Sequence, residues 1–493
     1  ALFHELRPPQ SAKVDVLQVH RAYTVGHVSF EAQRITVERP LDVRGQSLWQ
    51  LGDEAAHLSH VSGSTATVDT ERLLCIGQVL FQDQFLAEAP DMHTEFVRLW
   101  QPRWLRAGAQ PPELFERAAG FARAYLPTAA FSFPPITAAE WETALGKYKP
   151  FAARGTDGWS KQDLQNLPPQ ATAVLLDFFE RLEAGEASWP AQWVQGLVHG
   201  LQKRPGAASA DGHRPICIFS LAYRTWSSIR ARQALRQMLP LMQFEASGFL
   251  PSREPAEAWT AIQAAVEVHV QSGELLTGVS TDIIKAFNSL PRGHTFAVAA
   301  HIGLPASLLQ PWRSFLTRLE RRFCIREAVS GPCLSDTGFP EGCPLSTLAM
   351  ALTDLMFHRY LQAYAPRVRT LSYVDNLACV APEVASLAQG LTVTRCWAAL
   401  YKLDPGKTYA WATSSQARRA LKALGLTVLA GARDLGGVMS YGRAIRNQPL
   451  SDRCKALAPV SARLRRSRCP APLKLQVLPS KFWASALHGA SGC

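Results

Sequence analysis

Apolar residues recur at helical spacing along much of the chain. The pattern runs from about residue 92 to 126. It appears again in the segment after the GTDGWS loop (155–160), and then at 221–240 and 254–271. It also prevails over the last hundred residues. These segments predict a protein with a large helical content.

A domain boundary is predicted near residue 135. Pro134 and Pro135 interrupt the chain directly before a helical segment. Thr137 is a favourable N-cap for that helix, and Glu140 completes a capping box with it. Upstream, residues 1–90 show a mixed pattern with some β-leaning stretches.

Shorter apolar runs predict strands in the middle of the chain. Trp193–Leu201 and His213–Phe219 predict an antiparallel hairpin with a long polar tip. Residues 275–284, LLTGVSTDII, have the β-branched, apolar pattern of a buried strand. Two further strands are expected to meet at Asp375 and Asn376.

The composition is that of a globular protein. Apolar residues make up 47% of the chain and charged residues 19%, which excludes a disordered or collagen-like protein. The 493 residues allow about two to four domains. No apolar run reaches the ~20 residues needed to cross a bilayer, and the first residues lack the apolar region of a secretory signal. We therefore expect no membrane partner.

The cysteine pattern argues against a zinc ribbon and against a disulfide scaffold. The 10 cysteines are scattered, and no two have CxxC spacing. Free thiols are typical of a reducing compartment inside the cell.

The net charge of +12 is concentrated at the C-terminal end. Residues 401–493 contain 16 Lys and Arg against 3 Asp and Glu, whereas the first 400 residues contain 36 against 37. A basic segment of this kind fits either a polyanionic partner, most often nucleic acid, or a solvated basic surface.

Two acids stand where strands are predicted to end. Asp282 closes the run STDII, and Asp375 lies at the polar tip of SYVDNL. Either acid alone fits an ordinary turn or cap. If their strands are neighbours in one sheet, the two carboxylates would form a site for Mg²⁺, which binds carboxylates together with substrate phosphates.

Several other segments indicate a function only when they are considered together with this pair of acids. Residues 338–346, GFPEGCPLS, form a stiff loop with small side chains, which allows a close backbone approach. Lys203 and Arg214 flank the hairpin tip and are able to bind a triphosphate. Lys407 lies in a turn and is either a surface residue or a proton donor.

In their order along the chain, these segments resemble the motifs of reverse transcriptases, most closely those of non-LTR (LINE-type) retrotransposons. The likeness runs from about residue 136 to 445. The matching segments are GTDGWSKQDL (155–164), LQKRPG to AYRTW (201–226), ASGFLPSR (246–253), STDIIKAFNSLPR (280–292), GFPEGCPLS (338–346), SYVDNLACV (372–380), LDPGKTYAW (403–411) and LGGVMSYG (435–442).

The resemblance implies a role for each matching position. Asp282 and Asp375 would be the catalytic carboxylates that bind two Mg²⁺ ions, or Mn²⁺, and Ile283 would add a backbone carbonyl. Lys407 would be the candidate proton donor to the leaving pyrophosphate. Phe287 would be a steric gate that favours dNTPs. The residues implied to contact or shape the incoming nucleotide are Lys203, Arg214, Phe287, Gly342 and Pro344.

The basic C-terminal segment would then be a helical thumb that holds the template–primer duplex. Contacts from Lys and Arg to phosphates are independent of sequence and sensitive to salt. The residues expected to make them are Arg463, Arg465, Arg466, Arg468 and Lys474.

Three positions depart from the family pattern. Asn376 replaces the second acid of the YADD box, which would weaken metal binding. Glu341 replaces a glutamine and puts a negative charge near the nucleotide phosphates, which should weaken binding unless a cation neutralises it. Asn288 stands where many relatives have aspartate.

The resemblance implies an α+β right-hand polymerase with fingers, palm and thumb, preceded by a helical N-terminal extension. The expected parts are an extension over 1–135, fingers over 136–270, palm over 271–442 and thumb over 443–493. The implied activity is RNA-directed DNA synthesis by a mobile element, with an RNA template, a DNA primer or target and dNTPs, in the nucleus or cytoplasm.

Two alternatives remain at the level of the sequence. One is an inactive, reverse-transcriptase-like scaffold that binds nucleic acid, which Asn376 and Glu341 motivate. The other is a viral RNA-dependent RNA polymerase, which would carry an acid at position 287 in place of the aromatic gate.

Overall fold

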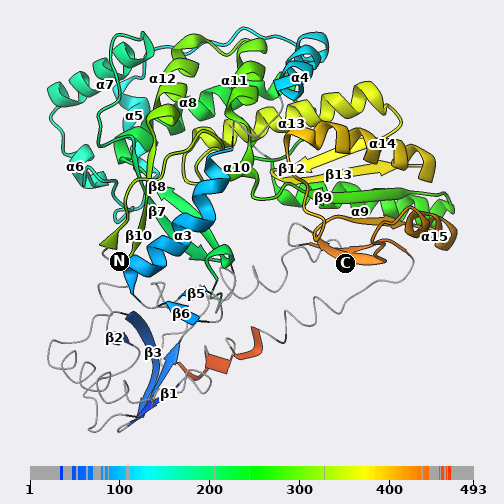
Figure 1. Ribbon diagram of the computed structural model, residues 1–493, viewed down its shortest axis with the longest axis horizontal. Helices are drawn as coiled ribbons and strands as arrows, with labels where there is room; N and C mark the ends of the chain where they lie inside the picture. Colours follow the sequence, from blue (N-terminus) through cyan, green and yellow to red (C-terminus); the bar gives the residue numbers. More distant parts are fainter. Residues whose placement is uncertain are drawn as a thin grey trace.

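Figure 1 shows the computed structural model of the chain. It describes residues 88–442 apart from 107–111, 204–206, 208, 244, 252, 327 and 435–436, together with strand segments between 34 and 86 and short pieces between 455 and 467.

A four-stranded antiparallel sheet forms the centre of the described structure. Its strand order is β12-β13-β9-β14. The strands are β9 (Thr277–Asp282), β12 (Arg369–Tyr373), β13 (Asn376–Ala381) and β14 (Tyr409–Ala412). The predicted strand at 275–284 and the predicted pair around 375 are therefore confirmed, and they are direct neighbours.

Both faces of this sheet are covered, which explains its continuous apolar runs. Leu377, Cys379 and Ala381 of β13 join the core that includes α13 (Leu345–Tyr364) and α14 (Val384–Trp397). Ala378 and Val380 point to the opposite face. There they pack with α9 (Pro255–Ser272) and with the small hairpin of β15 (Gly431–Asp434) and β16 (Gly437–Ser440). Figure 1 shows α13 and α14 on one side of the sheet and α9 on the other.

A second four-stranded sheet has the order β11-β10-β7-β8. The predicted hairpin is confirmed as the antiparallel pair β7 (Gln195–Gln202) and β8 (His213–Ile218). The edge strands β10 (Glu320–Ile325) and β11 (Ala328–Val329) come from much later in the chain, and β10 runs parallel to β7.

Helices surround this second sheet and share the large core. They are α5 (Ala138–Gly146), α7 (Pro169–Glu183), α8 (Leu221–Met238), α11 (Arg292–His301) and α12 (Ala306–Arg318). The shorter helices are α6 (Lys161–Gln165), α10 (Ala286–Ser289) and α15 (Ser415–Ala423).

The boundary near residue 135 coincides with the start of α5. The side chain of Thr137 accepts from the Glu140 amide and Glu140 returns a bond to the Thr137 amide, so the predicted capping box is confirmed. The division into fingers, palm and thumb stays a prediction.

The sequence predicts a helical N-terminal extension, but only part of the described extension is helical. Its helices are α3 (Ala89–Trp104) and α4 (Pro112–Tyr125). In the described part of the chain they follow six strands, which include β3 (Glu54–Ser62) and β4 (Thr65–Asp69). Short runs with Thr and Val favour strands here, so the prediction of a helical extension is wrong for the described part before residue 87. The remaining strands are β1 (Arg34–Thr36), β2 (Ser47–Leu51), β5 (Val79–Phe81) and β6 (Gln84–Leu86).

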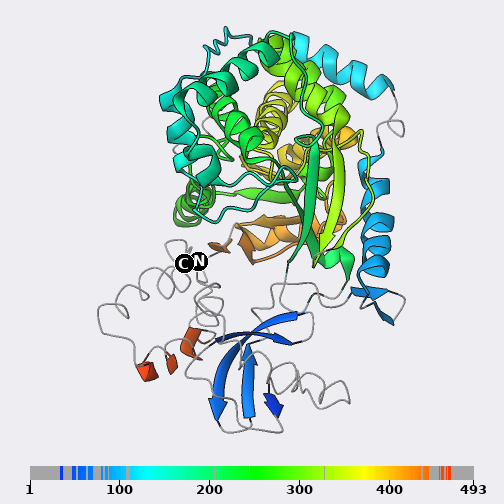
Figure 2. The same cartoon turned by 90° about the vertical axis from the view of Figure 1, so that its left-hand side faces the viewer.

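Helix α3 lies along the second sheet, as Figures 1 and 2 both show. Its Trp104 ring stacks on Phe323 of β10 with centroids 5.6 Å apart, and Phe96 of the same helix also contacts the Phe323 ring. Among the described residues, no helix is both long enough and apolar enough to span a bilayer.

Candidate active site

The two predicted acids meet at one edge of the central sheet. Asp282 is the last residue of β9, and Asp375 lies in the turn that joins β12 to β13. Asn376 is the register partner of Asp282, and the Ile283 amide donates to the Asp375 carbonyl at 3.2 Å. Antiparallel pairing of β9 with β13 therefore fixes the two carboxylates next to each other.

The surroundings of the two carboxyl groups disfavour their ionised forms. Burial, and then the charge of Asp375, raise the pKa of Asp282 to about 6. Burial also raises the pKa of Asp375. Oδ1 of Asp282 is buried and has no hydrogen-bond partner in the described part of the chain. A hard divalent cation would relieve both effects, so the donor set fits the predicted metal.

Lys407 contacts the same carboxylate. Its ammonium forms an ion pair with Oδ2 of Asp282. Although partial burial opposes it, this contact raises the pKa of Lys407. Lys407 therefore lies beside the predicted metal ligands, where a proton donor would be needed.

A cavity of about 570 Å³ opens in front of the acids. It brings together side chains from the hairpin, the strand ends and the loop segments. The predicted site residues that line it are Lys203, Arg214, Asp282, Phe287, Asp375 and Lys407. Six positions spread over about two hundred residues of sequence thus share one cavity.

Gly342 and Pro344 shape this region from behind the cavity wall. Neither residue lines the cavity. Gly342 has φ +108°, and a Cβ there would lie 2.2 Å from the Cys217 carbonyl oxygen of β8. Only glycine permits this close approach between the loop and the hairpin strand. Pro344 caps the start of α13.

Glu341 is neutralised by the cation that it faces. Arg214 Nε lies 3.3 Å from Oε2 of Glu341, whose side chain is 16% exposed. On its other oxygen, Glu341 accepts from Nδ2 of Asn288 at 2.7 Å. Burial raises the pKa of Glu341, and Arg214 and Asn288 hold part of that rise back. Two of the three departures from the family pattern are therefore bonded to each other.

The third departure, Asn376, does not line the cavity. Its backbone is the register partner of Asp282, but the cavity wall at this turn is formed by Tyr373, Val374 and Asp375. The amide therefore replaces an acid at a position next to the wall.

Sequence reasoning missed a cluster of charges around Lys203 at the cavity. Asp211, at the hairpin tip, accepts from Arg103 at 2.8 Å and pairs with Lys285 at 3.1 Å. Lys203 donates to the Asp211 carbonyl at 2.8 Å. Partial burial and the neighbouring Lys285 lower the pKa of Lys203 to about 8. Lys285 was visible inside the DIIKAF motif, but nothing in the sequence marks Arg103.

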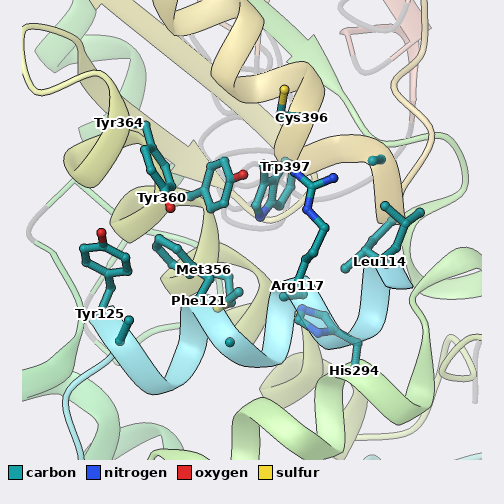
Figure 3. Close-up of a pocket in the computed structure, with 15 residues that line it drawn as sticks. Leu114, Arg117, Phe121, Tyr125, His294, Met356, Tyr360, Tyr364, Cys396 and Trp397 are labelled. Atoms are coloured by element: carbon teal, nitrogen blue, oxygen red, sulfur yellow. The ribbon is translucent and has the colours of Figure 1, made fainter. Parts of the chain in front are cut away.

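A separate cavity of about 340 Å³ lies between α4 and the helices α13 and α14. Figure 3 shows its aromatic wall, in which Phe121 lies with Tyr125, Tyr360 and Tyr364, and Trp397 lies beside Tyr360. It contains none of the residues predicted for catalysis or nucleotide binding.

The predicted thumb is described only in part. Arg463, Arg465 and Arg466 are exposed and lie in short helical pieces. Arg468 and Lys474 lie outside the described residues.

One comparison with known proteins gives a match, and it covers the segment that builds most of the cavity. Residues 201–428 match the family model of reverse transcriptase (RNA-dependent DNA polymerase). No curated protein matches the chain at a significant level. Residues 201–428 are therefore identified as a reverse transcriptase domain, and this domain indicates an RNA-directed DNA polymerase, a nucleotidyltransferase.

Proposed function

We propose that this protein copies an RNA template into DNA by adding dNTPs to a primer 3′ end, in the service of a mobile element of the non-LTR type. The observation that supports the chemistry is the pairing of Asp282 with Asp375 in one cavity with Lys203 and Arg214. The mobile element, a nicked DNA end as primer, and an intracellular location rest on the resemblance of the motifs.

The roles proposed for the side chains follow from their positions in the cavity. Asp282 and Asp375, which line the cavity, and the carbonyl of the adjacent Ile283 would hold two Mg²⁺ ions, or Mn²⁺. The bound metal would supply activation of the primer 3′ hydroxyl and charge stabilisation of the leaving pyrophosphate. Lys203 and Arg214 face the cavity from the hairpin and would bind the triphosphate.

Phe287 and Lys407, which also line the cavity, would act in nucleotide selection and turnover. The Phe287 ring would take the space of a ribose 2′-hydroxyl. Lys407 would give a proton to the pyrophosphate, because its ammonium lies at the metal-binding carboxylate.

Primer extension on a primed RNA template, with dNTPs and either Mg²⁺ or Mn²⁺, tests this proposal. We expect extension by the parent and by Asp177→Ala, which removes an exposed acid of α7, but not by Asp282→Ala or Asp375→Ala. Extension that survives both active-site changes would contradict the assignment of the two acids.

A second candidate function is a scaffold that binds nucleic acid without turnover, because an amide stands at position 376. In that case the parent would bind the template–primer duplex tightly and fail to extend it in either metal. Asn376→Asp would then be the first change expected to restore synthesis.

A further inference from the structure

The last turn of α3 reaches into the nucleotide cavity, although α3 precedes the matched family segment 201–428. Trp100 lines the cavity. Its ring lies under two cations, with Lys285 Nζ at 5.3 Å and the Arg103 guanidinium at 5.0 Å from the centroid. These distances allow attraction between each cation and the ring face.

Arg103 acts on the cavity through one carboxylate. Its Nη1 donates to Asp211 Oδ1 at 2.8 Å, and the same oxygen pairs with Lys285. Although burial opposes it, the bonds from Arg103 and Lys285 lower the pKa of Asp211, so the acid stays ionised. Lys203 is fastened to the carbonyl of the same residue. One acid thus holds cations from α3, the hairpin and the start of α10.

A second chain of bonds starts one residue later. Trp104 Nε1 donates to Oδ1 of Asn288 at 2.8 Å, and Asn288 in turn donates to Glu341, which holds Arg214. The bond between Trp104 and Asn288 is buried. A buried donor and acceptor that satisfy each other fix the position of both side chains.

The end of α3 is also anchored, which allows it to serve as a fixed support. The Trp104 carbonyl accepts from the amides of Asp336 and Thr337 at 2.9 and 3.0 Å. These bonds satisfy a carbonyl that the helix itself leaves unpaired. The indole of Trp104 lies against Phe323 and, at 4.2 Å, against the guanidinium of the buried Arg321.

We propose that α3 is a working part of the nucleotide site and that Arg103 is a positioning residue which sets Lys203 and Lys285, through Asp211, at the end of the cavity that receives the triphosphate. The proposal rests on the function proposed above. It extends the nucleotide site to an element outside the matched reverse transcriptase segment.

Replacing Arg103 by glutamine should weaken triphosphate binding for two reasons of the same sign. The change removes a cation from the neighbourhood of a polyanion. It also leaves the Asp211 carboxylate with less compensation, so that this acid attracts Lys285, its remaining ion-pair partner in the cluster, and the nearby Lys203 more strongly. Because these charges are partly exposed, we expect a Kd for dTTP that is about 3- to 10-fold higher.

The measurement is a titration of dTTP and Mg²⁺ into the full chain bound to an RNA–DNA template–primer with a dideoxy 3′ end, so that no bond is able to form. Arg98→Gln is the matched control, because Arg98 belongs to the same helix, pairs with Glu95 three residues earlier and does not line the cavity. Arg103→Lys keeps the charge and should recover part of the affinity. Melting temperatures of the three variants would report on the fold.

We expect weaker dTTP binding by Arg103→Gln and parental binding by Arg98→Gln. On an unblocked primer, Arg103→Gln should raise KM for dTTP and leave kcat near the parental value. An unchanged Kd in Arg103→Gln, or an equal loss in Arg98→Gln, would overturn the role of α3. A parent that binds dTTP but does not extend the unblocked primer would overturn the proposed catalysis, while the binding series still decides the role of α3. A parent that binds no dTTP would overturn both.

Discussion

At the scale of single residues, Asn288 and Glu341 show how two departures from a motif offset each other. The family pattern that the sequence resembles has an acid at 288 and an amide at 341, whereas this chain has the amide at 288 and the acid at 341. In this chain the two side chains are hydrogen-bonded, with Asn288 as donor and Glu341 as acceptor. The carboxylate has moved to the side that faces Arg214. This arrangement fits the presence of Glu341 in a cavity that is proposed to receive phosphates.

The pair predicts a reciprocal rescue. Asn288→Asp would put two carboxylates in contact and remove the donor, so we expect a loss of about 1–3 kcal/mol in the free energy of unfolding. In the double variant, Asn288→Asp with Glu341→Gln, the donor and the acceptor are exchanged. Most of the lost stability should therefore be regained. Urea unfolding of the parent, both single variants and the double variant measures the coupling. Additive losses in the double variant would show that the two side chains do not act as a pair.

At the scale of elements, helix α13 contacts strand β12, which leads to the turn with Asp375, through buried polar groups. His358 bonds to the Thr370 hydroxyl through Nδ1 at 2.7 Å and to the Ser372 hydroxyl through Nε2 at 2.8 Å. Both hydroxyls belong to β12, which leads directly to Asp375. One turn earlier in the helix, burial raises the pKa of Asp354 well above its usual value. The helix therefore presents neutral polar groups to the strand that leads to Asp375, one of the two proposed catalytic acids.

The stability contributed by His358 should depend on pH. Burial lowers its pKa to about 3 in the folded protein, against a usual value of about 6.5 in an unfolded chain. As the pH falls below about 6.5, the unfolded chain gains a proton that the native protein does not take up, so this contribution is lost progressively toward pH 3. His358→Gln removes this term. The deficit of the variant relative to the parent should therefore shrink by up to about 1.4 kcal/mol for each pH unit between about pH 6 and 4.

Urea unfolding of both proteins across that range measures the deficit. His294, whose pKa burial lowers to about 4, is present in both proteins and cancels in the difference. A deficit that stays constant with pH would show that His358 titrates alike in the folded and unfolded chains.

At the scale of the whole molecule, the sequence predicted individual helices and strands better than it predicted which of them lie next to each other. The hairpin of β7 and β8, the helix that starts after Thr137 and the strand that ends at Asp282 all follow from local patterns, because caps, turns and apolar periodicity are local properties. No such pattern shows that β10 joins β7, or that β9 lies between β13 and β14. The bond from Trp104 to Asn288 joins residues far apart in sequence, so only the packed core places them together. The cavity residues that sequence reasoning missed are of this kind.

The distribution of charge along the chain also belongs to the scale of the whole molecule. The first 400 residues are close to neutral, and several of their exposed arginines have partners. Arg181 pairs with Glu186, Arg367 pairs with Glu383, and Arg313 lies over the Phe296 ring. The C-terminal segment has few acids to pair with its basic residues. This excess of basic over acidic residues fits the predicted contact of the C-terminal segment with an external polyanion.

Salt dependence separates these two groups of arginines. Each phosphate contact adds about 0.7–0.9 to the slope of log K against log salt, so replacing Arg463, Arg465 and Arg466 by alanine should lower the slope for template–primer binding by about 2. Replacing Arg181, Arg313 and Arg367 by alanine removes the same charge and should leave the slope near that of the parent. Binding of a labelled duplex over a salt series gives both slopes. Because a general field effect depends on net charge alone, equal slopes in the two triple variants would argue that the C-terminal arginines make no direct contact with the duplex.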